Sequence, residues 1–318
     1  MSIDIAQSPV AGTTDVEVAA RLCSILARLG GSGPSAAAHA QIRRLTTAAF
    51  PRPLGDPAYR TNALNPGGTP VEVSFSEQTP RALRFDLTRG HPDTALADRR
   101  TDALRLAEVP VSTASRWEPY FADDRFGGFV SAVVGVDGQA AKAYLEVRRS
   151  REVLAALGSR SRVHESLLEA VPDLEPHFVA LDGARFAAHP RMYYECRNGI
   201  ALSTLVDWAA GHGLTRPALA AAHVTRRLTG RLILPEAGVL LALGTTSDSV
   251  ELKLELTRGV LDGDPLAAIR AVLVERPHGE QAFRDWCAAI DQPVRPTMVS
   301  VRICADGPLL SVYTGLAP

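Results

Sequence analysis

The sequence predicts an α+β fold, in which ten antiparallel strands close into a barrel and paired helices surround it. Residues 83–90 alternate apolar and charged side chains, and residues 252–259 repeat that pattern almost letter for letter. Such alternation is typical of a strand with one dry and one polar face, and internal repetition indicates a fold built from recurring units. Hairpin-like segments begin near residues 71, 129, 178, 238 and 296. Antiparallel strands leave exposed edges unless their sheet closes, so we expect a barrel.

Helical periodicity predicts two helices before each hairpin. The first covers residues 15–29, where Asp15 can cap its start and Gly30-Gly31 can end it. The second covers residues 35–50 and is closed by Pro51. The later helices are expected at residues 95–106, 112–121, 151–157, 163–171, 202–210, 216–228, 265–274 and 280–290. The chain therefore consists of five ααββ repeats.

Period-two alternation and turn residues predict the strands. Strands are expected at residues 71–77, around Arg84, and at residues 129–136, 140–147, 178–181, 191–196, 238–245, 250–256, 298–304 and 309–314. Turn signals between paired strands are Asp137-Gly138-Gln139, Ser247-Asp248-Ser249 and Asp306-Gly307. A ten-stranded barrel is wider than the eight-stranded kind whose interior side chains just fill it, so we expect a ligand-sized interior.

Composition limits the classes of function. The 318 residues are 46% hydrophobic and 22% charged, which suits a substantial core, and we expect residues 1–318 to form a single domain. The formal net charge of -1 argues against binding to nucleic acid or to an anionic membrane surface. No apolar run is long enough to span a bilayer, and residues 1–14 lack the pattern of a signal peptide. The four cysteines are widely spaced, so we expect reduced thiols in a cytoplasmic protein.

If helices cover the outside of the barrel, the polar face of each strand must point into the lumen. That face carries Glu72, Arg84, Asp86, Lys142, Tyr144, Glu146, Arg191, Tyr193, Glu195, Glu251, Lys253, Glu255, Arg302, Cys304 and Tyr313. Two plainer interpretations stay open at this point. Alternating charge can mark a solvent-exposed sheet face, and Glu72 can be a cross-strand partner of Arg84.

Several short motifs resemble those of the ABBA aromatic prenyltransferases, nearest to the indole (dimethylallyltryptophan synthase-like) and peptide prenyltransferase branches. Gly68-Thr69-Pro70-Val71-Glu72-Val73-Ser74 resembles the signature G-x-P-x-E-x-S, and Lys142-Ala143-Tyr144 resembles K-x-Y. Arg84 stands where the family has an arginine on the next strand, and Tyr313 where it has a late tyrosine. The resemblance covers the chain from Gly68 to the C-terminus and implies the family's PT barrel, ten antiparallel strands ringed by paired helices.

The resemblance also implies an activity, the transfer of an allylic prenyl group from a prenyl diphosphate to an indole, a phenol or a peptide side chain. It implies that Glu72 is catalytic and holds the N–H or O–H of the acceptor, that Arg84 and Lys142 bind diphosphate, and that Tyr144 and Tyr313 shield the allylic cation. Fixed cations stabilise a leaving diphosphate and tyrosine faces stabilise a carbocation. On that chemistry Lys253, Arg302 and Arg191 are further diphosphate-binding candidates, and Tyr193 is a further shield.

Two hairpins depart from the family's pattern. Residues 191–195 read R-M-Y-Y-E where the family has R-x-K-x-Y, and Lys253 pairs with Glu255 where the family has a tyrosine. Glu195 and Glu255 thus replace two shielding tyrosines, and we expect them to bind the acceptor. Their charge would suit a cationic acceptor, a peptide amine or a metal ion. The departures also keep an alternative open, a non-catalytic barrel that binds a small molecule or a peptide.

No metal site or cofactor is predicted. The eight histidines form no H-x-x-x-H cluster, and no motif supports a magnesium requirement. Trp117, Trp208 and Trp286 fall in helical segments, where we expect them to anchor the core rather than to contact a ligand.

Overall fold

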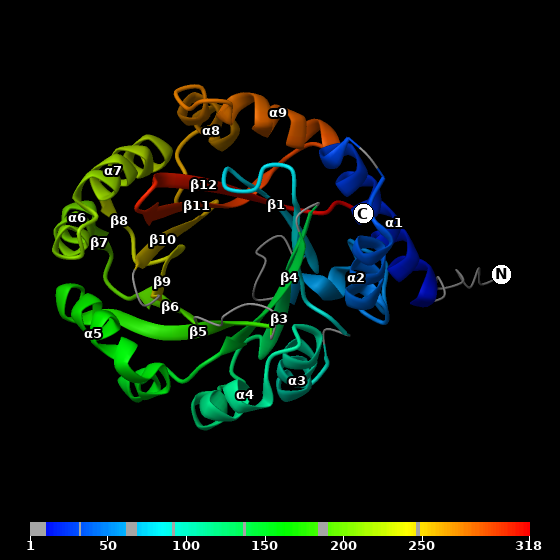
Figure 1. Cartoon of the computed structure of the whole chain (residues 1–318), viewed down its shortest axis with the longest axis horizontal. Helices are drawn as coiled ribbons and strands as arrows, with labels where there is room; N and C mark the ends of the chain where they lie inside the picture. Colours follow the sequence, from blue (N-terminus) through cyan, green and yellow to red (C-terminus); the bar gives the residue numbers. More distant parts are fainter. Residues whose placement is uncertain are drawn as a thin grey trace, which may run out of the picture.

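A closed barrel of ten antiparallel strands forms the centre of the molecule (Figure 1). The computed structural model describes residues 11–31, 33–61, 69–90, 93–135, 138–183, 190–245 and 249–318. Gly68 of the predicted motif, residues 1–10, and the predicted turn residues Asp137, Ser247 and Asp248 lie outside the described residues.

The strand order around the barrel is β1-β12-β11-β10-β9-β6-β5-β4-β3-β2, so each hairpin lies beside the next and β12 closes against β1. The barrel strands are β1 (Val71–Ser76), β2 (Leu83–Leu87), β3 (Gly128–Gly135), β4 (Gly138–Glu146), β5 (Leu174–Asp182), β6 (Arg191–Cys196), β9 (Val239–Thr245), β10 (Val250–Thr257), β11 (Pro296–Cys304) and β12 (Gly307–Gly315). Two short strands outside the barrel, β7 (Ile200–Ala201) and β8 (Ile233–Leu234), form a small ribbon that the sequence did not predict. The five predicted hairpins and the closed barrel are confirmed.

Pairs of helices surround the barrel, as Figure 1 shows. They are α1 (Ala11–Gly30) with α2 (Ala36–Thr46), α3 (Leu96–Leu106) with α4 (Val111–Trp117), η3 (Arg151–Arg160) with α5 (Ser161–Ala170), α6 (Leu202–Gly211) with α7 (Thr215–Thr229), and α8 (Pro265–Leu273) with α9 (Gly279–Ile290). Short 3₁₀ turns are η1 (Pro57–Thr61) and η2 (Glu118–Tyr120). One pair precedes each hairpin, which confirms the five ααββ repeats; in the third pair, η3 is a 3₁₀ helix.

Local chemistry explains where these helices begin and end. Ser35 caps α2 by accepting a hydrogen bond from the backbone N–H of Ala38. Asp264 caps α8 in the same way, and Pro265 occupies the first turn, where its missing N–H costs nothing. Helix α7 ends at Gly230, whose φ of 68° is the left-handed conformation that glycine adopts without strain.

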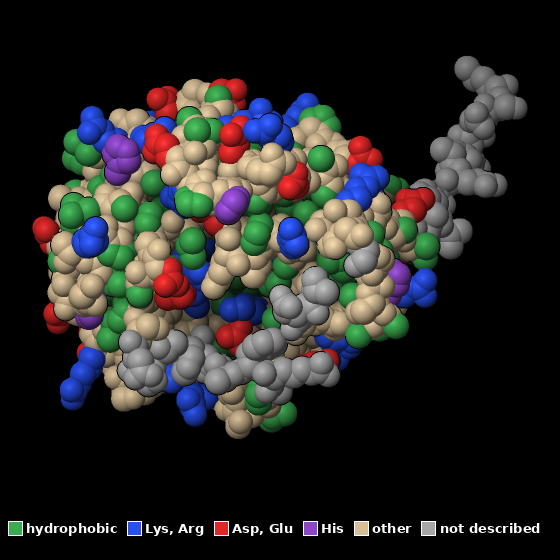
Figure 2. Space-filling view, turned by 45° about the horizontal axis from the view of Figure 1, so that its top comes forward, with side chains coloured by type: hydrophobic (Ala, Val, Ile, Leu, Met, Phe, Trp, Pro, Cys, Tyr) green, Lys and Arg blue, Asp and Glu red, His purple; other side chains and the backbone are tan. Residues whose placement is uncertain are grey.

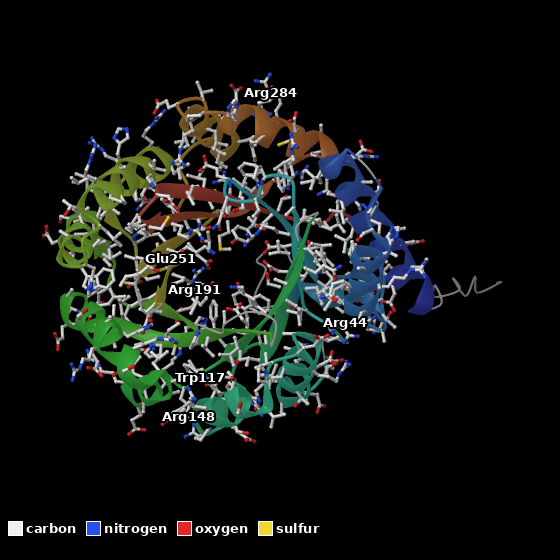
Figure 3. The ribbon with its side chains drawn as sticks, in the orientation of Figure 1. Arg44, Trp117, Arg148, Arg191, Glu251 and Arg284 are labelled. Carbon is white, nitrogen blue, oxygen red and sulfur yellow. The ribbon has the colours of Figure 1, made fainter. Side chains whose placement is uncertain are left out.

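The main hydrophobic core lies between the outer face of the barrel and the helices. Alternate strand residues such as Val71, Val73 and Phe75 are buried there. Trp117, Trp208 and Trp286 belong to the same core, with exposures of 1%, 7% and 1%, which confirms their predicted role as anchors. Figure 3 shows Trp117 on the inner side of the helical layer. Successive side chains of a strand point to opposite faces of the sheet. Because the apolar residues pack into this outer core, the residues that alternate with them face the lumen.

Three expectations about element boundaries were wrong. Asp15 does not cap the first helix, because α1 begins at Ala11; its carboxylate instead accepts the backbone N–H groups of Ala48 and Phe50 and ties α1 to the chain after α2. Helix α2 ends at Thr46, and Ala48 already has a φ of 55°. Strand β5 begins at Leu174, because a register shift after Pro176 interrupts the alternation on which the prediction rested.

Cys23, Cys196, Cys287 and Cys304 are free thiols. Burial raises the pKa of the Cys196 thiol, which makes it a poor nucleophile. Of the helices in the described part of the chain, none has the length and apolar composition needed to cross a membrane.

Candidate active site

Four of the predicted cations gather at the end of the lumen where the hairpins turn. Each lies near the turn of its own hairpin, and two acids stand among them. We call this group, made up of Arg84, Lys142, Arg191, Arg302, Asp182 and Glu251, the cation layer. Figure 3 shows Arg191 and Glu251 inside the barrel, and Figure 2 shows positive and negative side chains together in a hollow near the centre of one face.

Ion pairs already occupy most of the cation layer. Lys142 Nζ lies 2.9 Å from Asp182 Oδ1. Arg191 contacts Glu251, and Arg302 Nη1 lies 3.7 Å from the other oxygen of the same carboxylate. The two acids offset only part of the charge of four cations, so the layer keeps a net positive charge and suits an anionic ligand.

Arg84 and Gly244 have distinct roles in the cation layer. The Arg84 side chain makes neither a hydrogen bond nor an ion pair with another described residue, so its guanidinium is available to a ligand. Gly244 lies between Arg191 and Glu251 in the register of three neighbouring strands. A Cβ at Gly244 would lie 3.0 Å from Arg191 Nε, so the glycine lets the guanidinium cross its strand to reach the acid.

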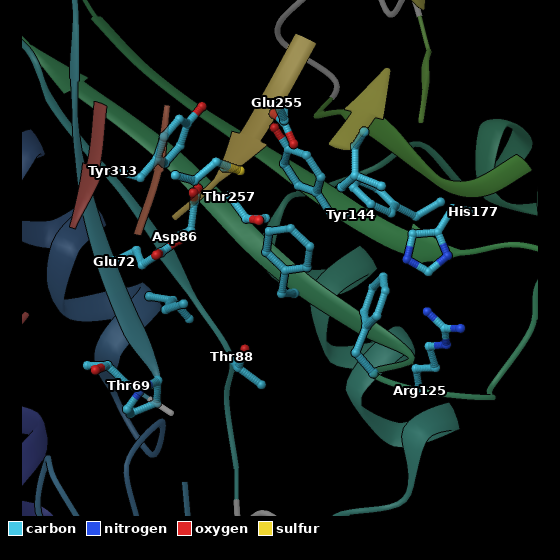
Figure 4. A pocket seen from close by; sticks show the side chains of 17 residues that line it. Thr69, Glu72, Asp86, Thr88, Arg125, Tyr144, His177, Glu255, Thr257 and Tyr313 are labelled. Carbon is cyan, nitrogen blue, oxygen red and sulfur yellow. The ribbon is translucent and has the colours of Figure 1, made fainter. Parts of the chain in front are cut away.

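A cavity of about 250 Å³ occupies the other half of the lumen, toward the strand ends that connect to the helices (Figure 4). The side chains that line it are of three kinds: carboxyls, aromatic rings and, at one side, a cation with an imidazole. Its lining includes Glu72, Asp86, Glu255, Phe126, Phe129, Tyr144, Phe178, Tyr313, Arg125 and His177. A cavity with a largely apolar wall and a few polar groups is typical of a small-molecule site.

Aromatic side chains form one wall of this cavity. The Tyr144 ring stacks on Phe129 at a centroid distance of 4.4 Å, and Phe178 stacks on Tyr193 at 4.2 Å. Phe126 packs edge-on against Phe129 and Phe178 at 5.8 Å. Burial raises the pKa of Tyr144 to about 12, so its hydroxyl stays protonated at neutral pH. This wall presents electron-rich faces of the kind that attract a cation.

Lys253, Glu255 and Tyr313 form a buried polar group beside the aromatic wall. Lys253 Nζ lies 2.5 Å from Glu255 Oε1 and donates to the Tyr313 hydroxyl at 3.0 Å. Burial alone would lower the pKa of Lys253, but the charge of Glu255 and the neighbouring phenols outweigh it and raise that pKa. The ammonium lies 5.5 Å from the Tyr313 ring centroid, which together with the contact to the hydroxyl places it at the ring edge and leaves the ring face open.

The Glu72 carboxyl on the cavity wall has a strongly raised pKa. Burial raises its pKa from 4.5 to about 8, the charges of Asp86 and Glu255 raise it further, and the hydrogen bond between Glu72 and Thr297 opposes them only in part. Glu72 lies opposite Asp86 in the register of β1 and β2, while Arg84 lies opposite Ser74. The interpretation of Glu72 as the direct cross-strand partner of Arg84 was therefore wrong.

Two acidic residues expected in the lumen, Glu195 and Glu146, lie outside the cavity wall. Glu195 contacts Arg149 at 2.9 Å and Arg125 at 3.5 Å, and it is not among the side chains that line the cavity. Glu146, expected in the open lumen, is buried and accepts the backbone N–H groups of residues 124–127 at 3.0–3.1 Å. It therefore holds the loop that carries Arg125 and Phe126.

The structure brings together Glu72, Tyr144, Tyr313 and Glu255 on the cavity wall, and Arg84, Lys142, Arg191 and Arg302 in the cation layer. Lys253 does not line the cavity but contacts it through Glu255 and Tyr313. Tyr193 lies behind Phe178 and is 1% exposed, so it supports the wall rather than lining it. Sequence reasoning missed the lumen aromatics Phe126, Phe129 and Phe178, as well as Arg125 and His177. The shared parity of Phe129 and Phe178 with the polar lumen residues was the signal that could have found two of them.

The described residues contain no group of three or more His, Cys, Asp or Glu side chains placed to hold a metal ion. No protein-family model matches the chain, and no curated protein matches it by sequence.

Solved structures do match the fold. The 6-dimethylallyltryptophan synthase from Micromonospora olivasterospora, solved in complex with DMASPP and Trp, aligns with a TM-score of 0.72 and 19% identity over 95% of this chain and 97% of that one. The 5-dimethylallyltryptophan synthase from Streptomyces coelicolor gives 0.71 and 17% over the same shares. AnaPT from Neosartorya fischeri gives 0.71 and 13% over 97% and 94%. The chain therefore has the PT-barrel fold of these synthases along nearly its whole length.

Proposed function

We propose that this protein transfers an allylic prenyl group from a prenyl diphosphate to a small electron-rich aromatic acceptor. One observation carries the proposal: a net-positive cation layer and a carboxyl-bearing aromatic cavity lie in the same barrel lumen. These are the two environments that the reaction needs, one for the leaving diphosphate and one for the allylic cation and its acceptor. The fold shared with dimethylallyltryptophan synthases supports the same reaction class.

In this reaction the carbon–oxygen bond of the donor breaks, and the electron pair leaves with the diphosphate. Arg84, Lys142, Arg191 and Arg302 would stabilise that charge, with Arg84 the most available. Tyr144 and Tyr313 would face the allylic cation and favour it through their ring quadrupoles. The acceptor's π electrons form the new bond, and the proton that it then loses passes to a carboxylate, for which Glu72 is the candidate.

An indole is the acceptor that we propose to test first. A cavity of about 250 Å³ is slightly smaller than typical small-molecule pockets of roughly 300–1,000 Å³, which favours a compact ring system over a peptide. Glu72 can accept an indole N–H while the aromatic wall packs against the ring. The Trp bound to the Micromonospora enzyme supports this choice.

The ion pairs of the cation layer favour a second candidate, a barrel that binds a ligand without chemistry. Lys142 and Arg191 are each neutralised by an acid, so a diphosphate must compete with Asp182 and Glu251 for them. Arg84 is the exception, and it therefore makes the most informative variant.

The test is a mass-spectrometric screen of allylic diphosphates with indole, phenol and peptide acceptors, with and without magnesium. We expect a prenyl mass increment on an indole. Glu72→Gln should lower kcat by at least about 10²-fold, the usual contribution of a positioned base. Arg84→Ala should lower kcat/KM for the donor by about 10²-fold, while Arg284→Ala, on the outer face of α9 (Figure 3), should leave it unchanged. Binding of inorganic pyrophosphate without product from any acceptor would favour the second candidate instead.

A further inference from the structure

Two carboxyls, those of Glu72 and Asp86, face each other on the cavity wall, and only Glu72 takes part in the proposed reaction. Glu72 on β1 and Asp86 on β2 are directly opposed in register, which places their Cβ atoms about 4.5–5.5 Å apart. Both side chains line the cavity, and Figure 4 shows them on the same part of its wall. Neither makes an ion pair with another residue in the described part of the chain. Two such carboxylates repel each other, so one proton between them is strongly favoured.

The charged and titratable groups around this pair come from several strands. They are Arg84 from β2, Tyr144 from β4, Lys253 and Glu255 from β10, and Tyr313 from β12, with Arg125 and His177 at the other side of the cavity (Figure 4). Glu255 is engaged with Lys253, so those two charges largely offset each other. The pair therefore decides the local charge at this end of the cavity.

The hydrogen bonds of Thr297 indicate that the proton resides on Glu72. The Thr297 hydroxyl lies 2.5 Å from Glu72 Oε1 and 3.1 Å from the backbone carbonyl oxygen of Tyr313. A hydroxyl has one proton and can donate to only one of these oxygens. Both contacts are satisfied when Glu72 carries its own proton and donates it to Thr297, which then donates to the carbonyl.

The surroundings of Asp86 stabilise a negative charge better than those of Glu72 do. Burial raises the pKa of Asp86, while a hydrogen bond from Ser131 and the nearby charges of Arg84 and Lys253 oppose that effect. Ser131 lies opposite Asp86 on one side and opposite Lys142 on the other, so a polar row leads from Asp86 to the cation layer. Glu72 has no cation among the groups that act on it, and the Asp86 charge raises its pKa.

We propose that Asp86 is a positioning residue that shares one proton with Glu72, carries the charge of the pair in the unliganded protein, and sets the pH at which Glu72 becomes a base. This inference rests on the proposed function for its catalytic meaning only. Glu72 can accept a proton from the acceptor once its own proton has left, and the fixed charge of Asp86 opposes that loss. Asp86 thereby confines the reaction to neutral and alkaline pH.

The kinetic test is the pH dependence of kcat/KM for the acceptor in wild type and Asp86→Asn. The acid limb of the wild-type profile should have a midpoint near pH 8. In Asp86→Asn it should move down by roughly two pH units, the order expected for two charges about 5 Å apart in an effective dielectric near 20. A merely structural role for Asp86 would lower the rate at every pH without moving the midpoint, and that result would overturn the proposal.

A titration without substrate separates this inference from the proposed function. Carbon-13 NMR of protein labelled at the Asp and Glu carboxyls should show one carboxyl titrating near pH 8, absent in Glu72→Gln and shifted down in Asp86→Asn. Asp182→Asn is the matched control, because Asp182 also faces the lumen but pairs with Lys142, and it should leave that titration in place. A Glu72 titration that is the same in Asp86→Asn and wild type would refute the shared proton, whatever the protein catalyses.

Discussion

Replacing Glu72 with glutamine should change how the stability of this protein depends on pH. The folded state holds the Glu72 proton up to a pKa of about 8, whereas the unfolded chain releases it near 4.5. The stability associated with this proton is therefore complete below pH 4.5 and is lost as the pH rises to about 8. Glutamine has no proton to lose, so the variant should not show this decline.

The size of the effect follows from the same pKa. A rise from 4.5 to about 8 corresponds to about 5 kcal/mol of unfolding free energy, the limit for a group without solvent contact. Glu72 is only half-buried on the cavity wall, and water there screens its charge. We therefore expect about half of that limit, roughly 2–3 kcal/mol.

The assay is urea unfolding of wild type and Glu72→Gln at about pH 5 and about pH 9, where the loss is nearly absent and nearly complete. The substitution also alters the contact with Thr297, but that contribution cancels when the difference between the two proteins is compared at the two pH values. The variant should gain roughly 2–3 kcal/mol on wild type between them. Glu280→Gln on the surface of α9 controls for the loss of one negative charge. An equal difference at both pH values would contradict the raised pKa of Glu72.

Three further predictions concern stability. Lys253→Met leaves the buried Glu255 carboxylate uncompensated and should cost about 3–5 kcal/mol by urea unfolding, and a double variant that also replaces Glu255 with Met should recover most of it. Glu146→Gln removes the charge that accepts four backbone N–H groups, so the amides of residues 124–127 should exchange faster and stability should fall by about 2–3 kcal/mol. Trp117→Ala empties a site in the helix–barrel core and should cost about 3–5 kcal/mol in thermal unfolding.

The barrel could be predicted because its chemistry is local. Each strand alternates between a face packed under helices and a face in the lumen, and that alternation is visible without knowing which strands are neighbours. Charged and apolar residues alternate in residues 83–87 and 252–256, and both segments are strands in the structure. Strand β5 shows the limit of this reasoning, because its register shift after Pro176 interrupts the alternation.

The arrangement inside the lumen could be predicted only in part, because it depends on register between strands. The parity of Arg191 and Glu251 placed both in the lumen, but nothing in either strand indicates that they pair across Gly244. The aromatic wall also depends on the register between strands. Phe129 and Phe178 lie on strands that carry few charges, so they resembled core residues until the pairing of β3, β4 and β5 placed them beside Tyr144.

The two ends of the lumen suit the two charged products of the proposed reaction. Transfer of a prenyl group creates a diphosphate anion and, one step later, a proton. The cation layer lies at the hairpin-turn end, and Glu72 with Asp86 lies beside the cavity toward the opposite end. Because charges interact strongly in such a poorly solvated space, a diphosphate next to Glu72 would raise the pKa of that carboxyl and would compete with it for the proton that the acceptor loses. Separating the two sites lets the charge of Asp86, rather than that of the leaving group, decide when Glu72 is ionised.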